Sequence, residues 1–128
     1  MSKNKIHRLG DLQLKIMQAL WERQEATVAE VDEALGNEID LAYTTIATML
    51  RKMEARGLAK HRSEGRSFVY SPAVAAAAVS RSMVDHLIDR VFEGSFAGMV
   101  SHLLTTREVS REELVQLERL IAERKKSR

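Results

Sequence analysis

A predicted helix carries threonines and an arginine on one side, where their side chains could contact the bases of a nucleic acid. The helix is expected from about Ala42 to Arg56. At about 100° per residue, Thr44, Thr48 and Arg51 form a narrow stripe along it, and Thr45 borders this stripe. A threonine hydroxyl exchanges hydrogen bonds with base edges, and its methyl group can touch the methyl group of thymine. Because exposed threonines lower helix propensity, we expect something other than helix stability to select them.

Basic residues gather in the segment that holds this stripe, although the whole chain has a formal net charge of only +2. Between Tyr43 and Pro72, six basic residues stand against two acidic ones. Such an excess is expected of a surface that faces phosphates, whereas a solvated charged face is the usual explanation of any single cluster. The first eight residues add three more bases without an acid, Lys3, Lys5 and Arg8. The residues expected to contact phosphate are Arg51, Lys52, Arg62 and Arg66.

No group of residues has the spacing of a catalytic or metal site. The chain has no cysteine, which excludes disulfides, a thiol nucleophile and a thiolate metal site. A glycine-rich phosphate loop, a nucleophile elbow and an HExxH pattern are also missing from the sequence. We therefore expect no enzyme activity, no cofactor and no metal. The four histidines lack the helical spacing of three or four residues that metal ligands favour: His7, His61, His86 and His102.

Two shorter helices are expected before the threonine-bearing one. The first runs from Asp11 to about Arg23, with Asp11 as its N-cap. The second begins with a capping box formed by Thr27 and Glu30 and stops at Gly36. After the third helix, Gly57 is placed to end it in a left-handed conformation.

A β-hairpin is expected next, from strands Leu58 to Arg62 and Arg66 to Tyr70 joined by Ser63, Glu64 and Gly65. Alternation along the second strand places Phe68 and Tyr70 on one face, which we expect to pack inward. The two arginines that flank the turn are expected to point at solvent or phosphate. Ser71 and Pro72 close the segment and mark a domain boundary.

From Ala73 onward the pattern predicts three helices and no strand, the last with a capping box of Ser110 and Glu113. Three short helices with one-sided apolar stripes cannot all hide those stripes within one tail, so we expect a symmetric partner to cover them. The residues expected at that contact are Val84, Leu87, Phe96, Met99, Val100, Leu103, Leu114, Leu117 and Ile121.

The predicted fold is mainly α with a small β-hairpin: a winged helix-turn-helix in residues 1–72, followed by a helical dimerisation domain in residues 73–128. In such a module the third helix enters the major groove of double-stranded DNA and the wing grips the backbone. The longest apolar run, Ala73 to Val79, is far shorter than the ~20 residues of a membrane span, and the N-terminus lacks the apolar stretch of a signal peptide. We therefore expect a cytoplasmic protein without stable membrane association.

Three stretches together resemble the penicillinase and methicillin-resistance repressor family (BlaI/MecI type): LGDLQLKIMQALW (residues 9–21), LAYTTIATMLRKMEARGL (residues 41–58) and RSFVYSP (residues 66–72). The resemblance implies a homodimeric repressor on a dyad-symmetric operator. It also implies relief of repression when a membrane sensor metallopeptidase leads to cleavage in the tail, where the matching bond joins His102 to Leu103 and replaces the familiar Asn-Phe bond. Thr44 stands where a lysine is typical of the staphylococcal members. The base-facing positions carried over from the family are Tyr43, Thr44, Thr45 and Thr48.

Two other functions fit the same residues. One is a winged-helix regulator that responds to a small ligand, which would need an apolar pocket with convergent polar groups between the tail and the DNA-binding domain. The other is a winged-helix protein-interaction module that does not bind DNA. The copper-responsive branch of the family uses a cysteine-rich motif, so the absence of cysteine excludes a thiolate copper sensor.

Overall fold

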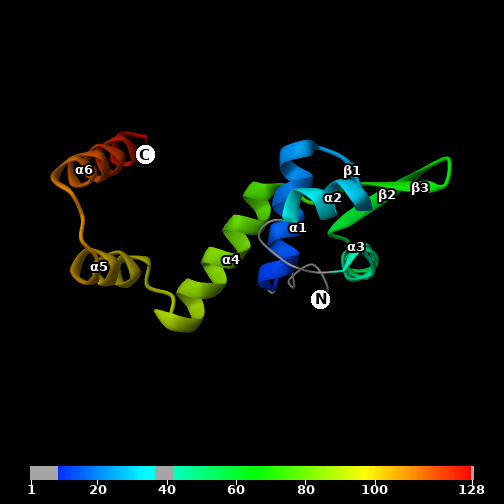
Figure 1. Cartoon of the computed structure of the whole chain (residues 1–128). Coiled ribbons are helices and arrows are strands. Elements are labelled where there is room, and N and C mark those ends of the chain that lie inside the picture. Colours follow the sequence, from blue (N-terminus) through cyan, green and yellow to red (C-terminus); the bar gives the residue numbers. More distant parts are fainter. Residues whose placement is uncertain (1–8, 37–41, 128) are drawn as a thin grey trace. The chain divides into compact units, whose positions relative to one another are not determined.

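The computed structural model describes residues 9–36 and 42–127 (Figure 1). The basic residues predicted near the N-terminus, Lys3, Lys5 and Arg8, lie outside these ranges. The described chain divides into two compact units, Met1–His86 and Leu87–Arg128, and the division falls within one helix. The first unit is a winged helix, and its elements follow in the order α1 (Asp11–Arg23), β1 (Ala26–Thr27), α2 (Val28–Leu35), α3 (Tyr43–Ala55), β2 (Ala59–Glu64) and β3 (Ser67–Pro72).

Helix α1 (Asp11–Arg23) has the predicted bounds, but its cap is Gly10 and not Asp11. The backbone N–H of Gly10 donates a hydrogen bond to Oε1 of Gln13 at 3.1 Å. Asp11 is therefore the first helical residue, where its carboxylate lies near the positive end of the helix dipole. The side chain that accepts from the N–H of the cap residue is therefore Gln13, in the first turn of the helix. The prediction of Asp11 as the N-cap was wrong by one residue.

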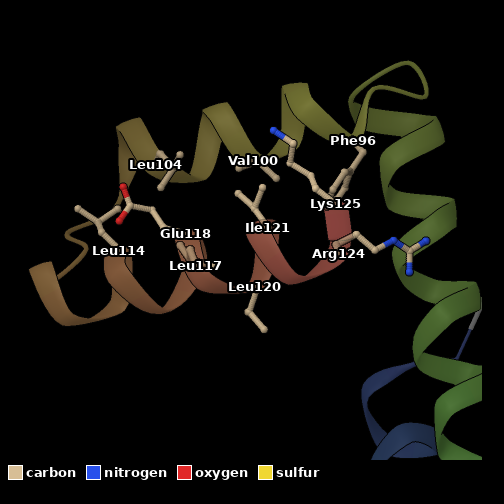
Figure 2. Close-up of a pocket in the computed structure, with 10 residues that line it drawn as sticks. All are labelled: Phe96, Val100, Leu104, Leu114, Leu117, Glu118, Leu120, Ile121, Arg124 and Lys125. Atoms are coloured by element: carbon tan, nitrogen blue, oxygen red, sulfur yellow. The ribbon is translucent and has the colours of Figure 1, made fainter. Parts of the chain in front are cut away.

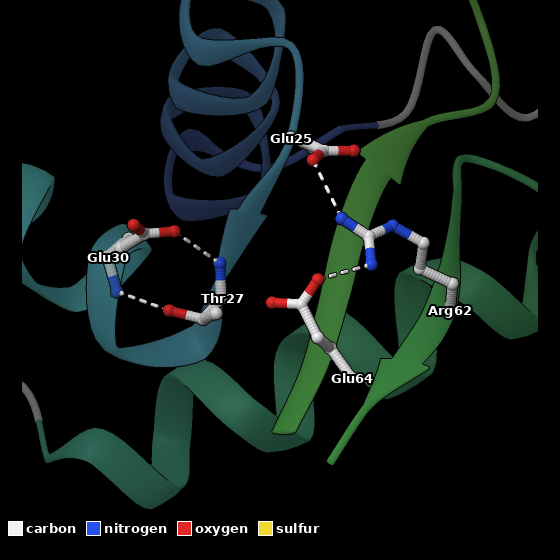
Figure 3. A network of polar contacts seen from close by, with 5 residues as sticks. All are labelled: Glu25, Thr27, Glu30, Arg62 and Glu64. Atoms are coloured by element: carbon white, nitrogen blue, oxygen red, sulfur yellow. Dashed lines mark hydrogen bonds and ion pairs between the residues drawn. The ribbon is translucent and has the colours of Figure 1, made fainter. Parts of the chain in front are cut away.

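The capping box predicted for α2 (Val28–Leu35) is confirmed. The backbone N–H of Glu30 donates to Oγ1 of Thr27 at 3.1 Å, and the N–H of Thr27 donates to Oε1 of Glu30 at 2.8 Å (Figure 3). These reciprocal bonds satisfy two backbone donors that a helix start leaves unpaired. They fix the start of α2 next to the strand that precedes it.

Helix α3 (Tyr43–Ala55) presents one apolar side to the core, as predicted. Ile46, Leu50 and Met53 are buried there. The helix ends at Ala55 with Arg56 as its C-cap, and Gly57 has φ +82°, which confirms the predicted left-handed residue.

The sheet differs from the predicted hairpin in length and register. Strands β2 (Ala59–Glu64) and β3 (Ser67–Pro72) pair from Glu64 opposite Ser67 to Ala59 opposite Pro72. Ser63 and Glu64 therefore belong to a strand and not to the turn, and Ser71 and Pro72 extend β3. The turn consists of Gly65, with φ +62°, and Arg66. A short strand β1 (Ala26–Thr27), which the sequence did not predict, pairs with the other edge of β3 to give the antiparallel order β1-β3-β2.

The core of the first unit lies where the three helices meet the sheet, and it includes Ile16, Leu20, Val31, Leu50 and Tyr70. It also includes Val79 from helix α4 (Ala76–Val91), with Val74 and Met83 packed against it. The compact unit therefore extends beyond Pro72 into α4, because apolar side chains of that helix complete the core. The domain boundary predicted after Pro72 stays a prediction.

The second unit contains the end of α4 and two further helices, α5 (Phe96–Thr106) and α6 (Arg111–Lys126). Gly94, with φ +84°, precedes α5, in the left-handed conformation that favours glycine. At the start of α6, Oγ of Ser110 accepts a hydrogen bond from the N–H of Glu113 at 3.0 Å, which is one half of the predicted capping box. In the described ranges, no helix combines the length and the apolar character that crossing a membrane requires.

Candidate nucleic-acid interface

The residues predicted to read bases lie together on the outer side of α3. Tyr43 is 51% exposed at the first turn of the helix, Thr44 and Thr45 are exposed beside it, and Thr48 is half-buried one turn later. Nη2 of Arg51 lies 3.5 Å from Oγ1 of Thr48, so the arginine extends along the same stripe. This side of α3 is opposite the side buried in the core. A helix anchored in this way presents a polar, rigid surface to an external partner.

A small hollow of about 240 Å³ joins this helix to the wing, the hairpin formed by β2, the Gly65–Arg66 turn and β3. It lies between the start of α2, the start of α3 and the turn of the wing. Three residues that carry hydroxyl groups, Thr27, Tyr43 and Ser67, line it together with Arg66. All the lining residues are Thr27, Val28, Ala29, Tyr43, Arg66, Ser67 and Phe68.

Phe68 does not pack inward as predicted, whereas Tyr70 does. Phe68 is 45% exposed and Tyr70 is 1% exposed, although both side chains are on the same face of β3. Phe68 pairs with Ser63 near the tip of the wing, beyond the helices that cover Tyr70. Its ring instead stacks on His61, with ring centroids 4.1 Å apart. Alternation gave the correct face, but the reach of the core along that face depends on tertiary packing.

His61, on strand β2 of the wing, contacts Glu54 near the end of α3. Its Nδ1 lies 2.7 and 2.9 Å from the two carboxylate oxygens of Glu54. Burial raises the pKa of the nearby Tyr70 hydroxyl, and the negative charge of Glu54 adds to that shift. Sequence reasoning missed the contact between His61 and Glu54, because it joins a helix to a strand across a turn and has no periodic signature.

Arg62, one of the two wing arginines, is held by two carboxylates (Figure 3). Its Nη1 lies 2.7 Å from Oε2 of Glu64, and its Nη2 lies 2.9 Å from Oε1 of Glu25. The side chain is 51% exposed. The hydrogen bonds that Arg62 donates to Glu64, and then to Glu25, raise the pKa of Arg62 further above its ordinary value. The predicted orientation of Arg62 toward solvent or phosphate is therefore incomplete, because two acidic partners far apart in the sequence from each other hold its guanidinium.

The other three predicted phosphate ligands are exposed cations. Arg51 and Lys52 lie on the outer side of α3, and Arg66 occupies the turn of the wing. Within the described residues, Arg66 makes no hydrogen bond or ion pair. Arg51 and Lys52 therefore lie on the side of α3 that carries the threonines. Arg66 lines the hollow beside that side.

The comparison with known sequences gives the family. The sequence profile of the penicillinase repressor family matches residues 9–123. This chain is a member of that family. It is 36% identical over 121 residues to the transcriptional regulator BlaI of Mycobacterium tuberculosis, covering 93% of this chain and 86% of that one. It is 28% identical over 121 residues to the penicillinase repressor of Bacillus licheniformis, covering 94% of each.

A solved structure of the DNA-binding domain of the repressor BlaI resembles the chain, with 32% sequence identity and a TM-score of 0.51. The match covers 57% of this chain and 89% of that domain. The winged-helix fold predicted from the sequence of this penicillinase repressor family member is therefore confirmed. The family comprises transcriptional repressors, which are not enzymes.

The tail of this family member exposes apolar side chains on each of its helices. An open hollow of about 860 Å³ lies between α5 and α6, and Figure 2 shows Val100 and Ile121 pointing into it from opposite sides. Arg124 and Lys125 lie at its other end from Leu104 and Leu114. Of the residues predicted at a dimer contact, Met99 and Val100 are half-buried in the single chain. The others are exposed: Val84, Leu87, Phe96, Leu103, Leu114, Leu117 and Ile121.

The bond predicted as a cleavage point, between His102 and Leu103, lies in the middle of α5. Both residues are exposed. The backbone carbonyl oxygen of His102 accepts hydrogen bonds from Oγ1 of Thr105 at 3.1 Å and from Oγ1 of Thr106 at 2.7 Å. The bond is therefore accessible, but it is part of a helix whose carbonyl groups are well satisfied.

Proposed function

We propose that this chain is a DNA-binding transcriptional repressor that acts as a homodimer on a dyad-symmetric operator. The observation that carries the proposal is the exposed face of α3, where Tyr43 and three threonines stand opposite a fully apolar side. Membership of a family of repressors supports the same function, as does likeness to the DNA-binding domain of the repressor BlaI.

In the proposed complex, α3 lies in the major groove. Thr44, Thr45 and Thr48 offer hydroxyl groups that can donate to or accept from base edges, and methyl groups that can contact thymine. Arg51 and Lys52 flank this face and are placed to contact phosphates. Phosphate contacts would fix the register of the helix on the duplex, and the threonines would supply the sequence preference.

The homodimer is proposed because apolar side chains of α5 and α6 remain exposed in the single chain. A second copy that covers the hollow lined by Val100, Leu117 and Ile121 would remove this surface from water. Two linked winged helices would then bind two half-sites, and the second contact would form at high effective concentration. Avidity of this kind can exceed the affinity for one half-site by roughly 10² to 10⁴ without new contacts.

Relief of repression is proposed to follow cleavage of the tail between His102 and Leu103 by a sensor metallopeptidase. The cut would separate α6 from the first half of α5 and so divide the surface that the second copy covers. Because peptidases bind extended chain and this bond is helical, α5 would have to open locally before the cut.

A mobility-shift titration tests DNA binding. The full chain is titrated against a duplex from the region upstream of its own gene and against a shuffled duplex of the same length and composition. We expect tighter binding to the upstream duplex by a factor of at least about 10³, the ordinary lower limit of specific recognition. Equal affinity for both duplexes would contradict sequence-specific repression. Failure to bind either would favour the protein-interaction module.

A further inference from the structure

We infer that the two wing arginines have different roles: Arg66 binds the DNA backbone, whereas Arg62 positions the wing and is kept from the DNA by Glu25 and Glu64. The Arg66 role rests on the proposed function, because it requires that the protein bind DNA. The Arg62 role rests on contacts within the protein alone.

The acidic partners of Arg62 come from different parts of the fold. Glu64 ends β2, the strand that also carries Arg62, and Glu25 lies between α1 and β1. At 2.7 and 2.9 Å, both contacts are charge-assisted hydrogen bonds of ordinary length. The local group of one guanidinium and two carboxylates carries a net negative charge. A phosphate approaching Arg62 would therefore have to displace two anions that are already in place.

The contact with Glu25 supports the sheet that aims the wing. Arg62 pairs across the sheet with Val69, and Val69 pairs on its other side with Thr27 of β1. Glu25 lies two residues before Thr27, so the ion pair bridges the three strands from one edge to the other. The bridge reinforces a sheet whose first strand is only two residues long. We therefore describe Arg62 as a positioning residue for the wing.

Arg66 has the opposite surroundings. It sits in the exposed turn between β2 and β3, without an ion-pair partner in the part of the chain that the structure describes. It lines the hollow of about 240 Å³ together with Tyr43 and Ser67, two residues that carry hydroxyl groups. Because Tyr43 is the first residue of α3, this hollow borders the proposed base-reading face. Guanidinium and hydroxyl groups are among the donors that contact DNA phosphates.

This arrangement makes Glu25 and Glu64 determinants of specificity. A phosphate contact strengthens binding to every DNA sequence, so a second free wing arginine would raise non-specific affinity along with specific affinity. Because the two carboxylates hold Arg62, this arginine makes no phosphate contact, and binding to DNA without an operator stays weaker. Their removal should therefore strengthen binding to DNA that contains no operator.

The test uses the full chain and three variants: Arg66→Gln, Arg62→Gln, and the double variant Glu25→Gln with Glu64→Gln. Binding to a random-sequence duplex of about 30 base pairs is measured across a range of salt concentrations, because removing one phosphate-binding cation lowers the salt slope by about 1. We expect Arg66→Gln to lower the slope by about 1 and Arg62→Gln to leave it unchanged. The double variant should raise the slope by about 1 and tighten binding roughly tenfold at ~0.1 M salt.

Amide hydrogen exchange of β2 and β3 supplies a readout that does not depend on DNA. We expect Arg62→Gln to speed exchange in the wing and Arg66→Gln to leave it at the wild-type rate, because of the two arginines only Arg62 makes ion pairs in the described structure. Circular dichroism confirms that each variant is folded.

Three results would overturn the inference. A fall in salt slope for Arg62→Gln equal to that for Arg66→Gln, together with wild-type exchange rates in the wing, would make Arg62 a phosphate ligand. An unchanged slope in the double variant would show that the carboxylates do not restrain binding. Wild-type exchange rates in Arg62→Gln would remove its positioning role. If the wild-type chain binds no DNA, the proposed function and the Arg66 role fail together, and the exchange data still decide the role of Arg62.

Discussion

Nε1 of Trp21 donates a hydrogen bond to the backbone carbonyl oxygen of Val74, 2.9 Å away. The bond connects the last turns of α1 with the segment between β3 and α4. Val79, one turn into α4, is buried in the same core. The start of the tail is therefore held against the winged helix by a polar contact and an apolar one, and both can be tested separately.

Trp21→Phe should lower the free energy of unfolding of the first unit by about 1–3 kcal/mol, because it removes one hydrogen bond and leaves a smaller packed ring. Urea unfolding followed by circular dichroism measures the change, because the variant removes the chain's single tryptophan. Val74→Ala is the control, since it trims the packed side chain but keeps the carbonyl acceptor. If Trp21→Phe is as stable as the wild type, the hydrogen bond from the indole to Val74 does not contribute to the free energy of unfolding.

A fragment of residues 1–72 should be less stable than a fragment of residues 1–86. The shorter one lacks Val79, which is 1% exposed, and the packed side chains of Val74 and Met83. Fully burying one valine contributes about 1.5–3 kcal/mol, so we expect a difference of at least about 2 kcal/mol in urea unfolding. Equal stabilities would place the functional boundary at Pro72, as the sequence pattern predicts.

Features of the fold that depend on neighbouring residues could be predicted from the sequence. The bounds of α1, the capping box of Thr27 and Glu30, and the left-handed Gly57 each follow from residues within one or two helical turns. The buried and exposed sides of α3 follow from its period of 3.6 residues. The proposed base-reading residues are found on the exposed side for the same reason.

Features that depend on residues far apart in the sequence were missed or misplaced. Strand β1 is too short to show alternation and exists because β3 offers it an edge. The exposure of Phe68 depends on where the helices stop covering the sheet. The pairing of Arg62 with Glu25 joins residues 37 positions apart, and no local pattern marks it. The charged partners of the wing arginine Arg62 could therefore be identified only in the three-dimensional structure.

Substitutions at Thr48 should separate its hydroxyl group from its methyl group in operator recognition. Thr48→Val removes the hydroxyl and Thr48→Ser removes the methyl, and each should weaken specific binding by about 1–3 kcal/mol only if the removed group contacts a base. Mobility-shift titrations against the upstream duplex and a shuffled duplex measure the two effects. Loss of affinity for both duplexes alike would point to a damaged helix. Wild-type operator affinity in both variants would remove Thr48 from the set of base-reading residues.

A charge on the apolar side of α6 should dissociate the proposed homodimer. Leu117 lines both hollows between α5 and α6, so Leu117→Glu would place a carboxylate in the covered surface. Ala122→Glu adds the same charge to α6 at a position that lines neither hollow, and it should remain dimeric. Analytical ultracentrifugation gives the oligomeric state, and circular dichroism checks the fold. A wild-type chain that is monomeric at micromolar concentration and still binds its operator tightly would contradict the architecture.

Cleavage at His102–Leu103 should become faster when the helix around the bond is loosened. Thr105→Gly together with Thr106→Gly removes the two hydroxyl groups that donate to the carbonyl oxygen of His102, at 3.1 and 2.7 Å, and lowers the helix propensity at both positions. Because the bond must leave the helix before a peptidase can bind it, the variant should be cut sooner than the wild type after induction. Ser101→Ala is the control, since its side chain makes no hydrogen bond in the described structure. Intact-mass spectrometry of repressor from induced cells follows the cut. Full induction with only the 128-residue chain present would rule out proteolytic switching and favour a ligand-responsive regulator.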